Sequence, residues 1–377
     1  MKIGLFSDAY LPEISGVTSV VSWLRRELER NGHEVHIYVP AYTGPQERES
    51  RVYRFRSRRF IFHKASRVAL PYNRRATRTF KRLDIIHSHT PFSLGLVALG
   101  ASARYRIPHI HTYHTHLVAY RHYLPFPLRP PKRTTAELAA WFCNRCTAVT
   151  VPSNPMREEL LGYGVKRPIH VLPFGVDQEL FHRPPVWDPR ESLGIDPSVR
   201  LYLYAGRLAA EKNLDFLLRA YKRIHAIDQD SVLVLAGDGP RRLALERLVH
   251  EEGLEKAVVF TGFLDHPRLV DLYKAADLFI FASKTETEGL VLVEAMAGGT
   301  PPVAIGEMGV LDVVEDGVSG LLVPEDEEKF AQTVLSLMDD PARYRKLQEG
   351  ALKRAKELSV QNATQKLIEI YAQYAKK

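Results

Sequence analysis

Residues 277–299 of the chain read DLFIFASKTETEGLVLVEAMAGG, and this stretch decides the fold. The apolar run from Asp277 to Ala282 predicts a buried strand, and Gly289 opens an apolar stretch suited to a helix that packs on a sheet. A buried strand, a short loop and a packed helix together form the repeating unit of a parallel α/β sheet. The loop is therefore expected at the carboxyl edge of such a sheet.

Two glutamates in this stretch, Glu286 and Glu294, stand eight positions apart. Glu286 falls in the loop, and Glu294 falls about a turn and a half along the helix, where its side chain still reaches the helix mouth. The backbone N–H groups of Gly289, Leu290 and Val291 have no partner inside a helix that starts here, so they suit an anion such as a diphosphate. Two hydroxyl acceptors beside a phosphate site predict a sugar-nucleotide site. The alternative is a pair of surface carboxylates on an amphipathic helix.

A second strand–loop–helix unit carries two cations. Leu201–Ala205 predicts a buried strand that runs into the loop 206–213 and a helix from Leu214 to His225. Arg207 and Lys212 lie in that loop. A planar guanidinium and a compact ammonium at the carboxyl end of a strand are suited to hold a departing diphosphate.

These motifs resemble those of the retaining GT-B glycosyltransferases of glycosyltransferase family four, which includes bacterial lipid glucosyl- and mannosyltransferases. The resemblance rests on Gly-Arg at 206–207, Glu-Lys-Asn-Leu at 211–214, the two glutamates, and EAMAGGTP at 294–301. It covers nearly the whole chain, because Gly16, the His111–His116 segment and the C-terminal helices also fall where that family places them. Glu288 departs from the pattern, since an aromatic residue or glutamine is commoner there.

Alternating strands and helices in both halves predict an α/β protein with parallel sheets and right-handed crossovers. We expect two doubly wound, Rossmann-like domains facing a cleft, the GT-B architecture. Residues 1–177 are expected to form the acceptor- and membrane-binding domain, and residues 178–360 are expected to form the nucleotide-sugar-binding domain. The resemblance alone implies that residues 361–377 pack back on the first domain. Composition indicates a linker at Pro173–Asp177 and Pro184–Pro189. The expected strands are Lys2–Phe6, His33–Val39, Arg51–Phe55, Asp84–His87, His109–Thr112, Ala148–Pro152, Leu201–Ala205, Val232–Ala236, Val258–Thr261, Leu278–Ala282, Pro302–Ile305 and Gly320–Val323.

The family resemblance implies a role for each of the main site residues. Arg207 and Lys212 would neutralise the diphosphate as it leaves, which is the largest charge change in the reaction. Glu294 would accept the ribose hydroxyls. Glu286 would hold the hydroxyls of the donor sugar and help to stabilise an oxocarbenium-like centre. His114 would reach hydroxyls of the donor sugar.

Further candidates lie in the first half of the chain. Gly16 allows close backbone approach in front of a helix N-terminus that can face a phosphate or the acceptor, although it can also serve as a turn glycine only. The 109–116 segment holds four histidines, a density that raises metal binding as an alternative, but no Asp, Glu or Cys accompanies them. We therefore expect no metal and no cofactor. His111 and His116 are expected to pack or to face the acceptor, and His89 is expected at the same sheet edge.

The charge of the chain is split between its halves. Residues 1–177 carry 27 Lys and Arg against 12 Asp and Glu, whereas residues 178–377 carry 25 against 32. The run from Arg51 to Arg82 holds twelve basic residues and no acidic one, mixed with Leu70, Tyr72 and Phe80. Basic residues interleaved with apolar ones predict attraction to an anionic membrane surface with shallow insertion; a solvated Arg-rich face is the alternative. The expected membrane and acceptor residues are Arg74, Arg75, Arg78, Lys81, Arg82, Tyr120 and Tyr123.

Composition bounds the class of protein. With 377 residues and 45% apolar content, the chain can bury two cores. It contains no apolar run long enough to span a membrane, it begins directly with a strand, and it has only two cysteines. We therefore expect a cytoplasmic protein, peripheral on the inner face of the cell membrane. The chain holds only an incomplete dinucleotide-binding fingerprint, so a dehydrogenase is not expected. It shows no RNA-reading motif, so a nucleic-acid partner is not expected.

The expected activity is retaining transfer of a hexose from a nucleotide sugar to a lipid. UDP-glucose and diacylglycerol are the expected pair, because the segment His111–Pro125 resembles that of diacylglycerol glucosyltransferases. One alternative is a GDP-mannose-dependent mannosyltransferase acting on a phosphatidylinositol-like or soluble acceptor. The other belongs to a different class, an anionic-surface or nucleic-acid binding module on an inactive fold of this kind.

Overall fold

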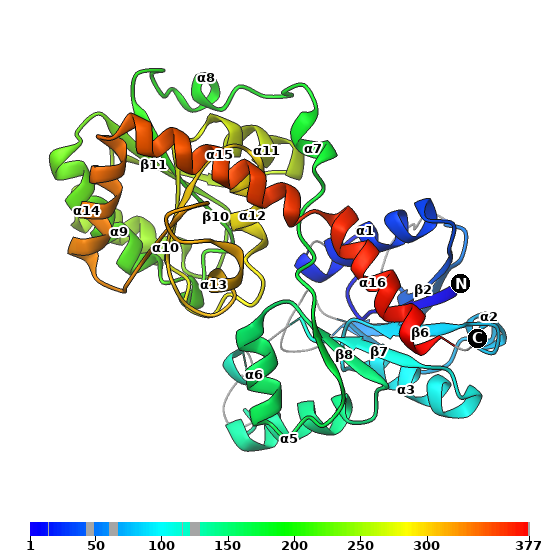
Figure 1. Cartoon of the computed structure of the whole chain (residues 1–377). Coiled ribbons are helices and arrows are strands. Elements are labelled where there is room, and N and C mark those ends of the chain that lie inside the picture. The colour runs from blue at the N-terminus through cyan, green and yellow to red at the C-terminus, as the bar shows by residue number, and fades with distance from the viewer. Residues whose placement is uncertain (14, 43–48, 60–66, 115, 121–128, 376–377) are drawn as a thin grey trace. The chain divides into compact units, whose positions relative to one another are not determined.

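The structure is a computed structural model, and it describes residues 1–13, 15–42, 49–59, 67–114, 116–120 and 129–375. The chain divides into two compact units (Figure 1). Unit 1 comprises Met1–Phe174 and Val360–Lys377, and unit 2 comprises Gly175–Ser359. Each unit is built around its own parallel sheet, as the alternating pattern predicts.

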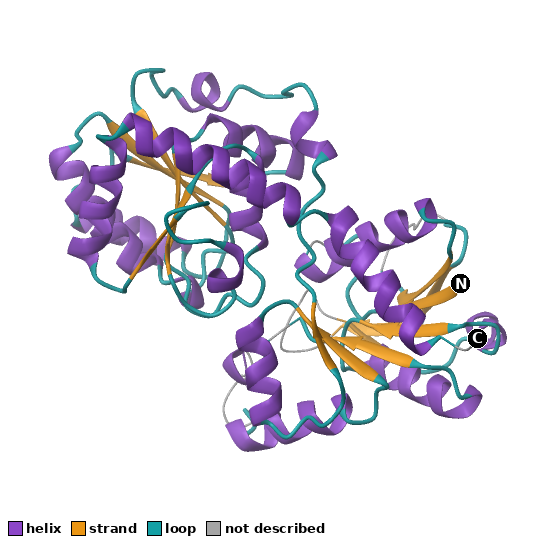
Figure 2. Ribbon diagram, viewed as in Figure 1, coloured by secondary structure: helices purple, strands orange, loops and turns teal. Residues whose placement is uncertain are grey.

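The described residues of unit 1 form a seven-stranded parallel sheet in the order β3-β2-β1-β6-β7-β8-β9. Its central strands are buried along nearly their whole length, which explains their continuous apolar sequence. Helices cover both faces of this sheet (Figure 2). The strands are β1 (Lys2–Phe6), β2 (Glu34–Pro40), β3 (Val52–Phe55), β6 (Ile85–Ser88), β7 (His109–Thr112), β8 (Ala148–Val151) and β9 (Ile169–Val171). The helices are α1 (Gly16–Arg30), α2 (Arg74–Phe80), α3 (Ser93–Tyr105), α4 (Leu117–Tyr120), α5 (Lys132–Cys143), α6 (Asn154–Gly162) and α16 (Val360–Tyr374).

A short antiparallel hairpin of β4 (Ser57–Arg59) and β5 (Arg67–Ala69) lies inside the basic run, and sequence analysis did not anticipate it. Arg67 is buried there, and its guanidinium donates to the Ala41 carbonyl at 3.2 Å and lies over the Tyr42 ring. The basic run is therefore not a uniformly solvated face. Strand β9 was also not anticipated, because its three residues are too short to show a period.

Unit 2 holds a six-stranded parallel sheet in the order β12-β11-β10-β13-β14-β15, with one large apolar core. Its strands are β10 (Arg200–Ala205), β11 (Ser231–Ala236), β12 (Val258–Gly262), β13 (Leu278–Phe281), β14 (Pro302–Ile305) and β15 (Leu321–Val323). Its helices are α7 (Glu179–His182), α8 (Pro189–Leu193), the 3₁₀ turn η2 (Ala210–Lys212), α9 (Leu214–Ile227), α10 (Arg242–Glu251), α11 (His266–Ala275), α12 (Leu290–Ala297), α13 (Val310–Val313), α14 (Glu327–Met338) and α15 (Pro341–Glu357).

The chain passes between the units twice, after Phe174 and after Ser359. Gly175 has a φ of +68°, and a Cβ built on it would lie 2.0 Å from the Leu358 carbonyl oxygen. The next residue, Val176, donates its N–H to that carbonyl at 3.1 Å. The close approach of two backbone segments thus requires glycine at position 175.

Two segments near the boundaries between the units each belong to a single unit. Pro184–Pro189, which its composition marks as linker, belongs to unit 2, where Asp271 of α11 accepts hydrogen bonds from two of its backbone N–H groups at 2.9 and 3.1 Å. Helix α16 belongs to unit 1, where the Tyr371 hydroxyl lies 2.5 Å from Nδ1 of His87. None of the helices in the described part of the chain combines the length and the apolar character that a membrane span requires.

Candidate functional site

Two loops meet at the carboxyl edge of the unit 2 sheet. Strands β10 and β13 are parallel neighbours, with Tyr202 beside Leu278, so the loops that follow them lie side by side. The first loop, residues 206–213, carries Arg207 and Lys212, and the second, residues 282–289, carries Glu286. Crevices at the carboxyl ends of parallel strands are the usual ligand sites of such sheets.

Lys212 and Glu286 join these loops directly. Nζ of Lys212 lies 2.5 Å from Oε2 of Glu286, and both side chains are mostly buried. Burial raises the pKa of Glu286, but the charge and hydrogen bond of Lys212 and the N–H groups of Gly289 and Glu288 outweigh it, so the pKa lies below its usual value. Glu286 is therefore held as a carboxylate.

Arg207 is held within its own loop. Its Nη2 lies 2.7 Å from Oε1 of Glu211, whose side chain is buried, while Arg207 itself is partly exposed. The Tyr204 hydroxyl donates to the Arg207 carbonyl at 3.2 Å. Glu211 is not among the site residues predicted from the sequence, although its spacing of four residues from Arg207 is a usable signal for an ion pair.

Glu294 lies in the second turn of α12 and is 8% exposed. Its Oε2 accepts from the Tyr273 hydroxyl at 3.0 Å, and its Oε1 lies 3.1 Å from Nε2 of His266. The hydrogen bond between His266 and Glu294 raises the pKa of His266 against the opposing effect of burial. Burial and the Glu294 charge raise the pKa of Tyr273. Both partners come from α11, and no local pattern in the sequence marks them.

The start of α12 is fixed by Gly289, which has a φ of +71° as its N-cap residue. The helical hydrogen bonds begin where the N–H groups of Leu292 and Val293 donate to the Gly289 carbonyl, at 2.9 and 3.2 Å. The N–H groups of Leu290 and Val291 precede this first helical bond, as expected for a helix start. The Gly289 N–H donates to the Glu286 carboxylate, and its expected role at a ligand anion stays a prediction.

In unit 1, Asp8 links the end of β1 to the start of α3. Its carboxylate accepts from the Thr90 hydroxyl at 2.6 Å, from the Ser93 hydroxyl, and from the Leu94 N–H at 3.1 Å. Burial raises the pKa of Asp8, and these three hydrogen bonds oppose that shift. Gly16 is the first residue of α1 and is exposed, with open space where a side chain would stand. Its backbone is thus approachable, and its role at a phosphate or acceptor stays a prediction.

Most histidines near β6 and β7 have structural partners. His87 bonds the hydroxyls of Tyr371 and Thr112 at 2.5 and 2.6 Å. His111 lies 2.8 Å from the Ser88 hydroxyl, and His116 lies 2.5 Å from Glu159. Tyr113, which lies between them in the sequence, is buried as well. His111 and His116 therefore pack within unit 1, one of the two roles expected for them.

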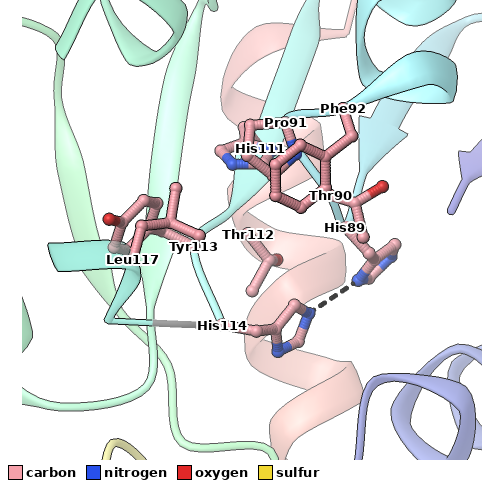
Figure 3. A pocket seen from close by; sticks show the side chains of 9 residues that line it. All are labelled: His89, Thr90, Pro91, Phe92, His111, Thr112, Tyr113, His114 and Leu117. Atoms are coloured by element: carbon pink, nitrogen blue, oxygen red, sulfur yellow. Dashed lines mark hydrogen bonds between the residues drawn. The ribbon is translucent and has the colours of Figure 1, made fainter. Parts of the chain in front are cut away.

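His114, the residue expected to contact the donor sugar, pairs with His89 (Figure 3). Nδ1 of His89 lies 3.0 Å from Nε2 of His114, and both residues line a cavity of about 30 Å³ at the ends of β6 and β7. Burial lowers the pKa of His114 to about 3 and that of His89 well below its usual range. Both imidazoles are therefore neutral. Among the described residues, no group of three or more His, Cys, Asp or Glu could hold a metal ion.

The basic patch, defined as Arg74, Arg75, Arg78, Lys81 and Arg82, lies on α2 and just after it, and all five side chains are exposed. Leu70 and Tyr72 beside it are exposed as well. The expected insertion of Phe80 is wrong: its ring is buried against Phe6 and Tyr38, with centroids 5.6 and 5.1 Å away, because α2 turns this residue to the core. Tyr123 lies outside the described residues, and Tyr120 is described only as the end of α4.

The chain matches known families over nearly its whole length. The family described as Glycosyltransferase Family 4 matches residues 14–180, and the family described as Glycosyl transferases group 1 matches residues 186–354. An alpha-monoglucosyldiacylglycerol synthase of Streptococcus pneumoniae is 32% identical over 389 residues, covering 98% of this chain and 85% of that protein. The same-named protein of Acholeplasma laidlawii is 30% identical over 345 residues, covering 87% and 86%. A GDP-mannose-dependent alpha-mannosyltransferase of Corynebacterium glutamicum is 27% identical over 388 residues, covering 99% and 89%.

Solved structures share the fold. HepE from Anabaena, in complex with UDP, has a TM-score of 0.78 at 21% identity, covering 99% of this chain and 100% of that one. Sucrose-phosphate synthase from Thermosynechococcus elongatus has a TM-score of 0.78 at 24% identity, covering 99% and 98%. Two doubly wound units, the matched families and near-full-length relatives agree with one another. The chain is a glycosyltransferase that belongs to glycosyltransferase family four and has the GT-B fold of two Rossmann-like domains.

Proposed function

We propose that this glycosyltransferase moves glucose from UDP-glucose to diacylglycerol and makes an α-glucosyl lipid, with retention at the anomeric carbon and without a metal ion. The observation that carries the choice of substrates is the near-full-length similarity, at 32% and 30% identity, to two proteins named as alpha-monoglucosyldiacylglycerol synthases. The chemistry of the site residues supports transfer from a nucleotide sugar, as follows.

We assign Arg207 and Lys212 to the diphosphate of the donor. The ammonium of Lys212 has three N–H donors and the guanidinium of Arg207 has five, so each cation has the capacity to bind its glutamate and a diphosphate oxygen together. A cation that is already in place stabilises the negative charge that develops on the leaving group in the transition state. It lowers the activation barrier because the site does not have to rearrange during the reaction. In our proposal, Arg207 and Lys212 bind the diphosphate and neutralise it as the sugar–phosphate bond breaks.

In our proposal, Glu286 and Glu294 accept hydrogen bonds from hydroxyl groups of the nucleotide-sugar donor. Glu286 is held as a carboxylate by Lys212 and the N–H groups at the start of α12, so it can accept hydroxyl hydrogens and favour positive charge at the anomeric centre. Glu294 holds one partner on each oxygen, and each carboxylate oxygen can accept a second bond. We assign Glu294 to the ribose hydroxyls, Glu286 to the sugar hydroxyls, and His114 to a further sugar hydroxyl.

Retention follows from the configuration of substrate and product. UDP-glucose is α-linked, and the name of the two relatives specifies an alpha product, so the same configuration on both sides of the reaction means retention. No separate nucleophile is assigned. We propose a same-face displacement in which a leaving phosphate oxygen accepts the proton of the acceptor hydroxyl while the new glycosidic bond forms.

A lipid acceptor and a peripheral position on an anionic membrane are supported by the surface of unit 1. The basic patch is exposed next to Val68, Leu70 and Tyr72, which are exposed apolar side chains. A mostly apolar groove of about 560 Å³ lies beside it, between β5, the end of α2 and α3. Cations attract anionic lipid headgroups, and apolar side chains insert below them. The groove is lined by residues that include Pro71, Phe80, Leu96, Val97, Arg104 and Tyr105.

A second candidate is transfer of mannose from GDP-mannose, which the similarity to the mannosyltransferase of Corynebacterium glutamicum favours. The test is a transfer assay with radiolabelled UDP-glucose or GDP-mannose and vesicles that contain diacylglycerol. We expect UDP-glucose to yield a glucolipid. In the proton NMR spectrum of that glucolipid, the anomeric proton should show the small coupling constant of an α linkage. A mannolipid made only from GDP-mannose would select the second candidate. No transfer, together with salt-sensitive binding to RNA or vesicles, would select an inactive binding module.

A further inference from the structure

His89 and His114 are paired edge to edge, nitrogen to nitrogen, at the carboxyl edge of the unit 1 sheet. His89 follows β6 and His114 follows β7, which are neighbouring parallel strands. Their ring centroids are 5.3 Å apart with an interplanar angle of 25°, and Nδ1 of His89 lies 3.0 Å from Nε2 of His114 (Figure 3). This separation fits a direct N–H···N hydrogen bond.

Further rings fix the orientation of this pair. The His89 ring lies 4.2 Å from the His87 ring, and the His114 ring lies 5.5 Å from the ring of Phe174. His87 is itself held by hydroxyl groups on both ring nitrogens, and His89 is only 2% exposed. The side chains therefore cannot turn over without breaking the packing around them.

A hydrogen bond between two neutral imidazoles needs one hydrogen between the nitrogens, and this couples the two tautomers. If His89 donates from Nδ1, its Nε2 is bare and His114 must carry its hydrogen on Nδ1. If His114 donates from Nε2, then Nδ1 of His89 is bare and the hydrogen of His89 stands on Nε2. The two residues thus share a tautomer, with both hydrogens on Nδ1 or both on Nε2.

The surroundings of His89 favour the first arrangement. Its Nε2 is buried and has no hydrogen-bond partner among the residues that the structure describes. In the second arrangement that nitrogen would be a buried N–H without an acceptor, which is rarer in proteins than an acceptor left unpaired. In the first arrangement, the only nitrogen left unpaired on His89 is an acceptor.

We propose that His89 is a positioning residue that holds His114 in one orientation with its hydrogen on Nδ1, so that His114 acts on the substrate as a hydrogen-bond donor. Such a donor suits a hydroxyl oxygen of a sugar. The substrate part of this inference rests on the proposed function, whereas the shared tautomer rests on the geometry of the pair alone. In many enzymes, a hydrogen bond to one ring nitrogen of a catalytic histidine fixes the tautomer and the orientation of the ring, while the second ring nitrogen acts on the substrate or metal.

The tautomer is read without any substrate by two-bond proton–nitrogen NMR of the ¹⁵N-histidine-labelled protein. The chain has 15 histidines, so the signals of the pair are assigned by their loss in His89→Gln and His114→Gln. We expect both rings to show a hydrogen on Nδ1. A hydrogen on Nε2 of His114, or an average of both tautomers, would overturn the proposal even if the enzyme proves to use other substrates.

Two variants of similar size then separate positioning from folding. His89→Asn places an amide where Nδ1 stands and can still donate to His114, whereas His89→Leu cannot. We expect His89→Leu to lower kcat about 10²-fold, the order expected for a displaced catalytic group, with the KM for the donor changed far less. His89→Asn should recover most of that loss and keep the tautomer of His114. His116→Gln serves as the control, because His116 bonds Glu159 and not the pair.

Equal kcat in the Leu and Asn variants, or an unchanged His114 tautomer in His89→Leu, would reject the positioning role. Two measurements show whether each variant keeps the fold. The unfolding temperature should stay close to that of the wild type, and the NMR signals of His109 and His111 should be unchanged. If no sugar transfer is found at all, the proposed function fails while the NMR result still decides the shared tautomer.

Discussion

Lys212 and Glu286 stand 74 positions apart in the sequence, yet Nζ of one lies 2.5 Å from Oε2 of the other. Their pairing joins the loops after β10 and β13 and presents a cation and an anion at one sheet edge. A cation there suits a diphosphate, and a carboxylate suits sugar hydroxyls. In the proposed function, these adjacent loops would hold the two halves of a sugar nucleotide.

Replacing Lys212 by Ala should slow the reaction strongly. Loss of one preorganised charge donor typically costs about 3–4 kcal/mol in the barrier, so we expect kcat to fall about 10²–10³-fold. The steady-state rate of glucolipid formation measures this, and circular dichroism checks the fold. Lys284→Ala is the matched control, because Lys284 also pairs with a glutamate, Glu325, at 2.7 Å, but on a more exposed surface. Near-wild-type turnover of Lys212→Ala would contradict the diphosphate role.

Transfer should keep the α configuration and continue in excess chelator. The expected reason is that Arg207 and Lys212, rather than a metal ion, meet the charge of the leaving diphosphate. Proton NMR of the product gives the configuration, and the rate in EDTA gives the metal requirement. A β-linked product, or activity lost in EDTA and restored by Mn²⁺, would show that the mechanism is different.

Reversing the charge of the basic patch should abolish binding to anionic vesicles. Changing Arg74, Arg75, Arg78, Lys81 and Arg82 to Glu replaces attraction of about 1 kcal/mol per basic residue by repulsion. Activity on vesicle-borne lipid should fall with it, whereas the affinity for UDP, measured by titration, should barely change. Sedimentation with anionic and neutral vesicles at low and high salt is the measurement.

The control for the patch is the same number of reversals elsewhere. Helix α15 in unit 2 offers five exposed basic residues, and their reversal should leave vesicle binding intact. Equal binding of the wild type and the patch variant at low salt would identify the patch as an ordinary solvated surface. The control residues are Arg343, Arg345, Lys346, Lys353 and Lys356.

The contact between His266 and Glu294 should stabilise the protein in acid more than in base. The hydrogen bond to Glu294 raises the pKa of His266 above the unfolded value of about 6.5, against burial and Arg183, and with help from Asp177. Protonated His266 therefore adds stability below about pH 6.5, and this stability is lost as the pH rises through the folded pKa. Thermal unfolding of wild type and His266→Gln should differ most below about pH 6.5 and converge as the pH rises above the folded pKa of His266.

His250 provides the comparison for this pH effect. It also lies beside a glutamate, with Nδ1 2.5 Å from Glu255, but both side chains are well exposed. Exposed pairs of this kind contribute little to stability. His250→Gln should therefore change the unfolding temperature little. A plot of unfolding temperature against pH for His266→Gln that runs parallel to the wild type would refute the assignment.

Gly175→Ala should destabilise the protein where the chain crosses between the units. A left-handed backbone costs an L-residue about 1–2 kcal/mol, and a Cβ at 2.0 Å from the Leu358 carbonyl oxygen adds a clash. Gly194→Ala isolates the first effect, because Gly194 has a φ of +66° and nothing within 4 Å of its Cβ position. The unfolding temperature should fall more for Gly175→Ala than for Gly194→Ala. Equal shifts would mean that the close approach does not matter.

The sequence by itself predicted most of the sheet strands and the position of the central loops. Buried parallel strands are continuous apolar runs, and the Gly-containing segments that follow them mark loops at one edge, so both are visible locally. Arg207, Lys212 and Glu286 are predictable as site residues because they occupy such loops. The pairing of Lys212 with Glu286 follows only once β10 and β13 are known to be neighbours.

Tertiary structure alone decided which side chains meet. Phe80 belongs to an Arg-rich segment, but α2 turns it toward Phe6 and Tyr38, where burial of its ring outweighs any gain at the surface. Tyr273 and His266 reach Glu294 because α11 packs on α12, and a local pattern does not encode that packing. Periodicity reports whether a residue is buried; the partner it meets depends on contacts between segments far apart in the chain.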